Sequence, residues 1–501
     1  MIKSILFLVF LILFTPNEIV SQDYIITDTG QNTCYDTLVV IPCPQSGEPF
    51  YGQDSQYDGT QFSFLNNNNG TITDLNTGLI WQQFLFENKF TYEEALAIAD
   101  TFSINGFDDW RLPSIKEIYS LIDYRGMTGL SVEESIPFID TTYFEFRYGN
   151  LSAGERFIDA QYVSSTAYVG TTMNGDFTVF GVNFADGRIK GYGTVMPGGI
   201  EKLFEVRLVR GNENYGINDF VDNGDGTITD NSTGLLWSKY DNGTGLNWEE
   251  ALDWAYQKNQ ENYLGYNDWR LPNAKELQSI VDYSRCPQTT NSAAIDTIFN
   301  VTPIIDEGGE TNYPFYWTNT THPDGNEQNR FIKAVYIAFG EALGFMEIPP
   351  NSGNYVLMDV HGAGAQRSDP KQGDPENYPH GFGPQGDVIR IYNYIRLVRG
   401  GSVSEVEKSE TGQLYDYKLE QNYPNPFNPS TTISFSIQYA GNITLKIFNV
   451  LGNETEVLVN KFLPSGKYSF VWNAERQPSG VYFYQLNATS YSEMKKMILI
   501  R

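Results

Sequence analysis

The chain contains little histidine, little cysteine and little positive charge for its length. Its 501 residues include three His, three Cys and 33 Lys and Arg against 61 Asp and Glu, so the formal net charge is −28. Such an acidic chain repels nucleic acid and anionic membranes, and we expect neither as a partner. The three histidines (His322, His361 and His380) match the spacing of no zinc motif, and their Gly, Pro and Asn neighbours favour surface loops.

Linear motifs of catalysis are also missing. The sequence has no G-x-S-x-G, H-E-x-x-H or P-loop pattern. Cys286 has no histidine near it in sequence, so we interpret it as a small buried residue rather than a nucleophile. We therefore predict a protein without catalytic activity and without a cofactor. A glycan-active enzyme is the alternative, because a glycosidase needs only two carboxylates and no linear motif.

Only one long apolar run is present, at the N-terminus. Lys3 precedes an unbroken apolar stretch (5–14) that ends at Pro16, which is the layout of a secretory signal peptide at residues 1–22. No later stretch reaches the ~18 apolar residues of a membrane helix, so we expect no transmembrane segment in the mature protein. Export through the periplasm permits disulfides, and Cys34 and Cys43 in the N-terminal segment (23–60) are the predicted pair.

Two copies of one sequence unit follow. The matching stretches are NNNNGTITDLNTGLIW (66–81) with DNGDGTITDNSTGLLW (222–237), DDWRLPSIKEI (108–118) with NDWRLPNAKEL (267–277), and RLVRG at 207–211 and 396–400. A unit of this length is a domain rather than a solenoid repeat. We predict two domains, at residues 61–211 and 212–400.

The acidic turn of the second copy suggests two structures. Asp222, Asp225 and Asp230 lie around two glycines and resemble a calcium loop, but the first copy has Asn at the first two of these positions. Both copies keep glycine, asparagine and alternating apolar residues, which predict a β-hairpin. A calcium site in the second copy alone is the alternative.

Each copy then predicts helices followed by strands. Ser or Thr with Glu three residues later marks capping boxes at Thr91 and Ser114, and Asn takes the same place at Asn247 and Asn273. Lys116, Glu117 and their counterparts in the second copy are expected on solvated helix faces. Aromatic strands follow, and we expect the closing RLV strand to pair with the first strand, which would bring the ends of the unit together. The fold class is therefore α+β.

The C-terminal part differs in charge and pattern. Residues 401–416 are rich in Ser and Glu and predict a linker. Residues 417–501 carry eight Lys and Arg against five Glu, and short strands at even spacing predict a small Ig-like β-sandwich.

The repeated motifs resemble a known family. DGTITDNSTGLLW, DWRLPNAKEL, YWTNT and RLVRG are similar to those of DUF1566, also called the Lcl C-terminal domain. The WRLP element is also similar to that of formylglycine-generating enzymes, which implies a C-type-lectin-like fold; their activity depends on a cysteine pair that Cys286 alone does not supply. The family resembles an exported binding module, and its named member is an adhesin for sulfated glycans. Sulfate sites need clusters of Arg and Lys, which this acidic region lacks.

The C-terminal motifs NYPNPFNPST, PSGVYFYQL and KKMILIR resemble a type A sorting domain of the type IX secretion system. This resemblance implies that residues 417–501 are recognised by that machinery and are removed after export. The expected location is the outer-membrane surface or the extracellular medium.

These observations together predict a secreted tandem binding protein for a glycan or matrix polymer. Two linked weak sites gain avidity. Trp317 and Asn319, in the YWTNT strand, are the candidate ligand contacts, together with the insertion at 340–380. Packing of Trp317 in the core is the alternative for that residue. A structural surface component without a small ligand is the alternative function.

Overall fold

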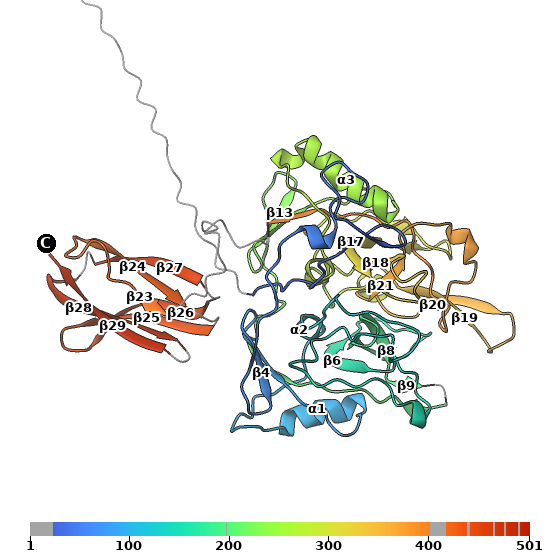
Figure 1. Cartoon of the computed structure of the whole chain (residues 1–501), viewed down its shortest axis with the longest axis horizontal. Helices are drawn as coiled ribbons and strands as arrows, with labels where there is room; N and C mark the ends of the chain where they lie inside the picture. The colour runs from blue at the N-terminus through green and yellow to red at the C-terminus, as the bar shows by residue number, and fades with distance from the viewer. Residues whose placement is uncertain are drawn as a thin grey trace, which may run out of the picture.

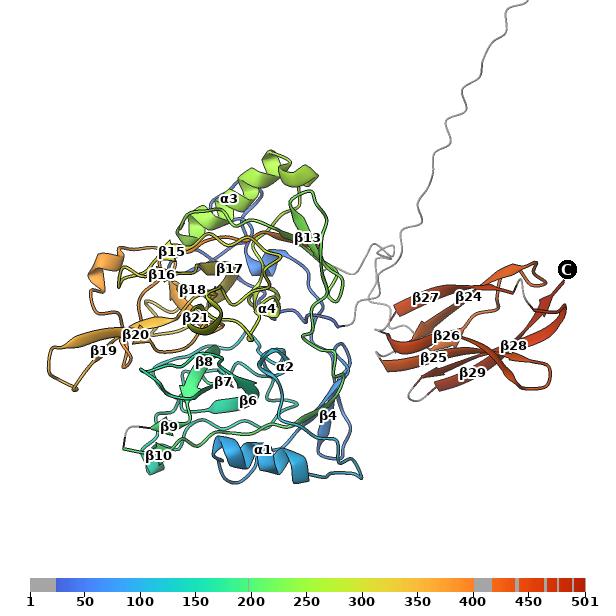
Figure 2. The ribbon, with the colours of Figure 1, turned by 180° about the vertical axis from the view of Figure 1, so that it is seen from behind.

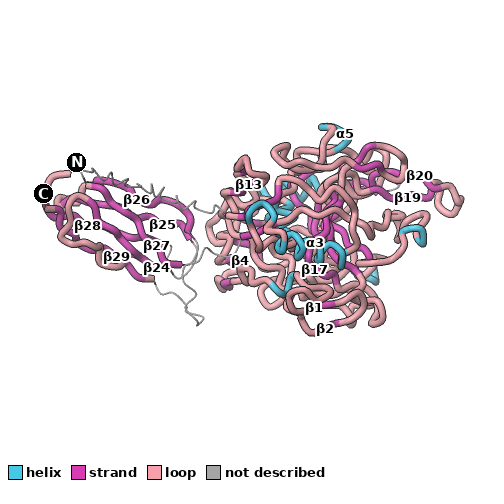
Figure 3. Tube along the Cα trace, turned by 90° about the horizontal axis from the view of Figure 1, so that it is seen from above, coloured by secondary structure: helices cyan, strands magenta, loops and turns pink. Residues whose placement is uncertain are grey.

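A computed structural model describes residues 24–196, 198–400, 417–437, 441–463, 466–474, 477–488 and 491–500 (Figure 1). The predicted signal peptide and linker lie outside these ranges. The described chain is of mixed α+β class, with many strands in antiparallel sheets and few helices, as the magenta and cyan segments of Figure 3 show. The predicted α+β class is confirmed.

The first copy opens with the predicted hairpin. Strands β4 (Thr71–Asp74) and β5 (Leu79–Gln82) pair, and β3 (Phe64–Asn66) and β11 (Val209–Gly211) complete a sheet in the order β11-β5-β4-β3. The closing strand therefore pairs with β5, the second strand of the hairpin, and not with the first strand of the unit as predicted, because β3 and β4 lie on the other side of β5. Helices α1 (Tyr92–Thr101) and α2 (Ile115–Tyr119) begin at the predicted capping boxes, in which the Glu at the third helical position bonds back to the cap.

The second copy repeats this plan. Its sheet has the order β12-β13-β14-β22, and its helices begin at the predicted asparagine caps. These elements are β12 (Phe220–Asp222), β13 (Thr227–Asp230), β14 (Leu235–Ser238), β22 (Val398–Gly400), α3 (Trp248–Gln260) and α4 (Ala274–Ser279). The hairpin of β19 (Leu343–Glu347) and β20 (Tyr355–Asp359) is an insertion of this copy and projects from the body in Figures 1 and 2.

The two copies share one six-stranded sheet, which the sequence analysis did not anticipate. The first copy contributes β6 (Gln161–Ala167), β7 (Thr178–Asn183) and β8 (Arg188–Gly193), and the second contributes β17 (Phe315–His322), β18 (Lys333–Ala338) and β21 (Gln366–Pro370). The order β17-β18-β21-β8-β7-β6 places the equivalent strands β21 and β8 together at the centre. Buried residues of both copies form one continuous core. The tandem repeats are therefore fused into a single body.

A reciprocal pair of lysines joins the copies across this junction. Lys116 Nζ donates to the carbonyl of Ser279 at 2.6 Å, and Lys275 Nζ donates to the carbonyl of Ser120, the equivalent residue, at 2.8 Å. Burial lowers the pKa of Lys116 to about 8 and that of Lys275 to about 7. The predicted solvated faces are thus wrong, because these lysines cross the inter-copy interface and Glu117 is also buried.

The C-terminal module forms two facing sheets with their own apolar core. The sheets have the orders β23-β24-β27 and β26-β25-β28-β29, and their core includes Phe435, Ile447 and Tyr484. The strands are β23 (Lys418–Leu419), β24 (Ser430–Ile437), β25 (Gly441–Asn449), β26 (Glu454–Leu463), β27 (Gly466–Asn473), β28 (Gly480–Ala488) and β29 (Tyr491–Leu499). Two facing antiparallel sheets around one apolar core agree with the predicted β-sandwich.

Short elements complete the body. They are β1 (Cys34–Tyr35), β2 (Val40–Ile41), η1 (Asp54–Gln56), η2 (Leu151–Ala153), β9 (Val195–Met196), β10 (Ile200–Glu201), η3 (Tyr263–Gly265), α5 (Pro287–Thr290), β15 (Ile304–Ile305), β16 (Thr311–Asn312) and η4 (Pro375–Asn377).

Candidate ligand-binding pockets

The WRLP motif and the helix after it line cavities at equivalent places in the two copies. In the second copy the cavity encloses about 280 Å³, and we call it the Asn319 pocket. Its polar lining includes Asp28, Asp54, Tyr57, Arg270, Glu276 and Asn319. In the first copy the cavity encloses about 790 Å³ and is called the Tyr215 groove. Its lining includes Arg111, Lys116, Glu117, Ser165, Tyr215 and Asp282.

A paired arginine and glutamate are common to both cavities. The guanidinium of Arg270 donates two hydrogen bonds of 2.6 Å to the two carboxylate oxygens of Glu276. Arg111 and Glu117 form the same bidentate pair at 2.7 Å. Each glutamate also accepts from the backbone N–H of its helix cap, so its charge is held by several donors. The motif therefore builds a rigid polar wall at the start of the helix.

A bulge in β17 positions Asn319 in the pocket. The register between β17 and β18 shifts between Trp317 and Thr321, which frees the intervening backbone from the ladder. The backbone N–H of Asn319 donates to the carbonyl of Pro272 in the WRLP motif at 3.0 Å. The Thr320 hydroxyl accepts from the N–H of Ala274, the first residue of α4, at 3.1 Å. The bulge thus ties the strand to the motif.

The side chain of Asn319 is buried and unpaired. It is 1% exposed, and neither its amide nitrogen nor its amide oxygen has a hydrogen-bond partner among the described residues. An unpaired buried amide costs about 1–3 kcal/mol, so native structures rarely leave one without a reason. Because Asn319 lines the pocket, a bound molecule can supply both missing hydrogen bonds.

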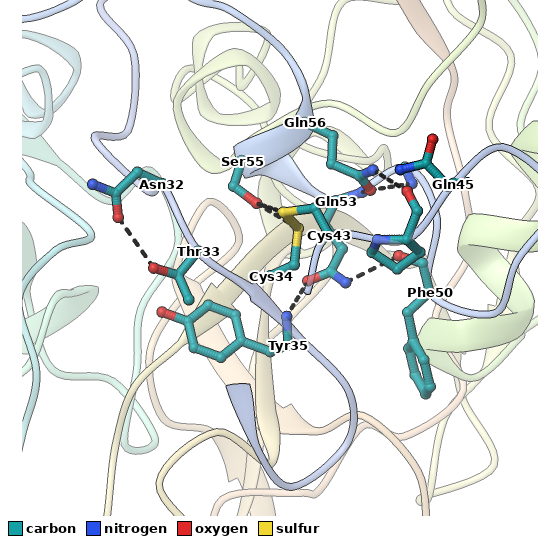
Figure 4. The surroundings of a disulfide bond; sticks show 12 residues. Asn32, Thr33, Cys34, Tyr35, Cys43, Gln45, Phe50, Gln53, Ser55 and Gln56 are labelled. Atoms are coloured by element: carbon teal, nitrogen blue, oxygen red, sulfur yellow. Dashed lines mark hydrogen bonds between the residues drawn. A yellow bond between two sulfur atoms is a disulfide. The ribbon is translucent and has the colours of Figure 1, made fainter. Parts of the chain in front are cut away.

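The N-terminal segment closes one side of the Asn319 pocket. The disulfide between Cys34 and Cys43, with Cα atoms 5.1 Å apart, ties together the loop before η1 (Figure 4). Asp54 in η1 accepts hydrogen bonds from the hydroxyls of Thr29 at 2.8 Å and Thr320 at 2.5 Å. The side chain of Gln31 pairs with the backbone of Thr321 through its amide oxygen and nitrogen. The segment is thereby fixed across the bulge of β17.

The electrostatics of the Asn319 pocket are strongly acidic. Four carboxylates (Asp28, Asp54, Asp58 and Glu276) line it against the single guanidinium of Arg270. Burial raises the pKa of Asp54 to about 7 and raises that of Asp28 as well. Repulsion from Asp28 and Glu276 adds to the rise at Asp54, and repulsion from Glu276 adds to the rise at Asp28. Such a site favours neutral or cationic groups over anions.

The Tyr215 groove is wider because a different segment borders it. Residues between the copies, including Tyr215 and Asn218, take the place that the N-terminal segment has at the other cavity, and Asp282 comes from the second copy. Ser165 stands at the position of Asn319; its N–H donates to the carbonyl of Pro113 at 2.8 Å, and its hydroxyl donates to the same oxygen. The first copy therefore keeps the framework without the unpaired amide.

The structure separates the two predicted ligand contacts. Trp317 is fully buried, its indole N–H donates to the carbonyl of Leu246 at 2.9 Å, and its ring packs edge-on against Tyr336. A ring in this position cannot stack on a ligand, so the prediction of Trp317 as a ligand contact is wrong and the core-packing alternative holds. Asn319, two residues later in the irregular stretch of the strand, lines the pocket.

The acidic turn is part of a hairpin. One carboxylate oxygen of Asp222 accepts from the N–H of Gly224 and the other from Lys239, while Asp225 accepts from the N–H and hydroxyl of Thr227. Asp230 is buried and accepts from Asn218 and the turn of residues 232–233. Among the described residues no group of three His, Cys, Asp or Glu side chains could hold a metal ion. The calcium alternative for these three aspartates therefore finds no converging ligand set.

Calcium is accordingly expected to leave the stability of the protein unchanged. A ligand that binds only the folded state raises Tm by mass action. Because the three aspartates do not converge on one point, we expect about 1 mM calcium to shift Tm by less than about 1 °C. Thermal melts with calcium and with EDTA check this result. A clear rise that Asp225→Asn removes would restore the calcium interpretation.

Two of the histidines differ from their predicted surface placement. His322 and His361 are buried, and His361 Nε2 lies 2.9 Å from a carboxylate oxygen of Asp387. Burial lowers the pKa of His361 to about 4. His380 is exposed and its ring stacks on Tyr355 at 3.9 Å. Cys286 is fully buried, as expected for a small apolar residue.

The carboxylates of the N-terminal segment are the part of the site that sequence reasoning missed. Asp28 and Asp54 belong to no repeated motif, and only the fold brings them to the pocket. Arg270 and Glu276 could have been found, because their spacing in WRLPNAKE is identical to that of Arg111 and Glu117 in WRLPSIKE.

With this geometry in place, the comparisons define the class of protein. The Lcl C-terminal domain matches residues 70–210 and 226–359, and the chain belongs to this family. A secretion system C-terminal sorting domain matches residues 421–500. The chain is thus a pair of Lcl C-terminal domains followed by a type IX secretion sorting domain, which directs the protein to the outer-membrane surface or the medium.

No curated protein matches the chain. Among solved structures, the chain matches that of PorZ, which is described as an essential bacterial surface component of the type IX secretion system of human oral-microbiomic Porphyromonas gingivalis. It shares 14% identity over 92% of this chain, with a TM-score of 0.14, and the match spans 61% of that protein's chain. We take no argument about fold or function from this likeness.

In the part of the chain that the structure describes, no helix is both long and apolar enough to cross a membrane.

Proposed function

We propose that this exported surface protein is a non-catalytic glycan-binding adhesin, and that the Asn319 pocket is its binding site. The observation that carries the proposal is the buried amide of Asn319, which has both its donor and its acceptor unpaired at the cavity. A sugar hydroxyl both donates and accepts hydrogen bonds, so it can satisfy an amide in this position.

The rest of the lining supports a polyhydroxylated ligand. Asp28 and Asp54 offer acceptors for hydroxyl groups, and Tyr57 adds an aromatic wall that lies against Arg270. The site is formed by fixed elements, namely a helix start, a bulged strand and a segment stapled by a disulfide. A preformed pocket loses less entropy when it binds.

We further propose that each copy has a C-type-lectin-like fold. The arrangement that supports this proposal is a short antiparallel sheet closed by the first and last strands of the unit, with two helices and a further sheet between them.

The absence of catalysis is part of the proposal. Both oxygens of Glu276 are held by Arg270, and Asp54 is held by two threonine hydroxyls, so these groups serve as fixed acceptors. A glycosidase would instead need a free acid and a free base on opposite sides of one bond. Recovery of an intact oligosaccharide after incubation, measured by mass spectrometry, tests this point, and shortened products would contradict it.

Replacing Asn319 with alanine is expected to weaken glycan binding without loss of stability. The amide has no partner among the described residues, so its removal leaves no hydrogen-bond donor unsatisfied and Tm should stay within about 2 °C of the parent value. Binding is measured on a glycan array with the exported chain, and the best ligands are then titrated. Affinity should fall at least about tenfold, the equivalent of one good hydrogen bond.

The matched control is Asn300→Ala, at an exposed asparagine of the second copy that lines neither cavity, which should bind glycans like the parent. If Asn319→Ala binds as tightly as the control, the pocket is not the site. If the parent binds no glycan on the array, the structural interpretation of the protein replaces the adhesin.

A further inference from the structure

We propose that the Asn319 pocket recognises an amino sugar through its protonated amine. This inference rests on the proposed glycan-binding function and specifies the class of sugar. The observation behind it is a convergence of two buried carboxylates, Asp28 and Asp54, whose hydrogen bonds come from neutral donors, next to an unpaired amide.

The two cations at or beside the pocket, Arg270 and Lys275, already have hydrogen-bond partners. Arg270 donates to both oxygens of Glu276, so these two charges neutralise each other. Lys275 lies nearby, but its three hydrogen bonds go to the Thr27 hydroxyl and to the carbonyls of Asp28 and Ser120. Neither cation is directed at the remaining carboxylates.

Asp28 and Asp54 are held by neutral donors instead. Asp54 accepts from two threonine hydroxyls, and Asp28 accepts from the N–H of Gly30 at 2.7 Å. Both residues are at most 5% exposed. Burial outweighs the opposing charge of Lys275 at Asp28, so the pKa of this carboxyl is raised. A buried carboxylate without a cation is costly, and a ligand ammonium would supply the missing charge. The raised pKa of Asp54 agrees with this shortage of positive charge.

The rest of the pocket fits a sugar ring that carries the amine. The amide of Asn319 offers one donor and one acceptor to a neighbouring hydroxyl. The cavity of about 280 Å³ is near the lower limit for small-molecule sites, so it suits one sugar ring rather than a chain. Sulfated and uronic sugars are disfavoured, because their anions would face Asp28 and Asp54. N-acetylation removes the ammonium and with it the main attraction.

The test compares matched oligosaccharides with the full exported chain. Fully deacetylated chitin trisaccharide and its N-acetylated form are titrated by calorimetry at about pH 7, near the pKa of Asp54, where a ligand ammonium can draw this carboxyl into its charged form. We expect the amine form to bind at least about tenfold more tightly, and Asp54→Asn to bring the ratio of the two affinities close to one. Asp28→Asn provides a second variant with the same expectation. Thermal melts confirm that each variant is folded.

The outcomes separate this inference from the function on which it rests. If both trisaccharides bind equally, or the acetylated form binds more tightly, the pocket binds glycans but the amine is not recognised. A simple aliphatic diamine that binds as tightly as the amino sugar would also overturn the inference, because the ring would then contribute nothing. If neither these sugars nor any glycan of the array binds, the proposed function fails as well.

Discussion

Replacing Trp317 with alanine is expected to lower the free energy of unfolding by about 3–5 kcal/mol, the usual cost of removing a buried aromatic side chain. The indole is fully buried, packs against Tyr336 and satisfies the carbonyl of Leu246. The substitution leaves a cavity and removes one of the two hydrogen bonds that the carbonyl of Leu246 accepts, the other coming from the N–H of Asn393. Chemical denaturation of the exported chain, followed by tryptophan fluorescence and circular dichroism, measures the loss.

Two variants control this experiment. Trp317→Phe keeps most of the apolar volume and should cost much less than the alanine variant, although it also loses the hydrogen bond to Leu246. Asn319→Ala, two residues away on the same strand, should leave stability almost unchanged. If Trp317→Ala is as stable as the parent but no longer binds glycans, Trp317 is a ligand contact after all and the interpretation of both residues is reversed.

Replacing Asp54 with asparagine is expected to stabilise the protein above neutral pH and not below about pH 4. The folded-state pKa of Asp54 is about 7, because burial disfavours the charged form, whereas an unfolded aspartate titrates near 3.9. The folded state therefore holds a proton that the unfolded state has released, and this stabilising contribution is lost as pH rises from about 4 to 7. Asparagine cannot ionise, and its oxygen can still accept from Thr29 and Thr320.

The free energy of unfolding of the variant should exceed that of the parent by roughly 4 kcal/mol above pH 7. The folded and unfolded pKa values of Asp54 differ by about three units, and each unit corresponds to about 1.4 kcal/mol. Denaturant melts at several pH values measure it. Asp109→Asn is the control, because Asp109 is exposed and its ion pair with Arg210 lowers its pKa, so that variant should show a small effect of the opposite sign. A stability difference for Asp54→Asn that does not depend on pH would show that this carboxyl is not buried as a neutral acid.

Local parts of the fold could be predicted from the sequence because short-range physics determines them. Thr91 and Asn247 cap their helices as capping boxes require, and the glycine-rich turns form hairpins. The shared sheet could not be predicted, because β8 and β21 are joined by a long-range contact for which the alternation of residues gives no partner. Lys116 illustrates the same limit: a lysine next to a glutamate on a short helix is usually solvated, and only the second copy buries it.

The candidate site shows a similar division. The sequence pointed to Asn319 through an aromatic strand, but Trp317 in that strand was assigned wrongly, because it is buried in the core whereas Asn319 lies in the irregular stretch that lines the pocket. The repeat alone could have identified Arg270 and Glu276. Asp54 could not be found from the sequence, because it comes from a segment outside the repeat and reaches the pocket only through tertiary packing.

The end of β22 has a mechanical consequence. Gly400 is the last described residue before the linker, it lines the Asn319 pocket, and its carbonyl accepts a hydrogen bond from Arg270 at 3.2 Å. If the protein binds a polymer as proposed, a pull applied to the chain beyond Gly400 would act directly on a wall of the pocket. Such tension would load the pairing of β22 with β14, and the lifetime of the bond would then depend on this strand as well as on the ligand contacts.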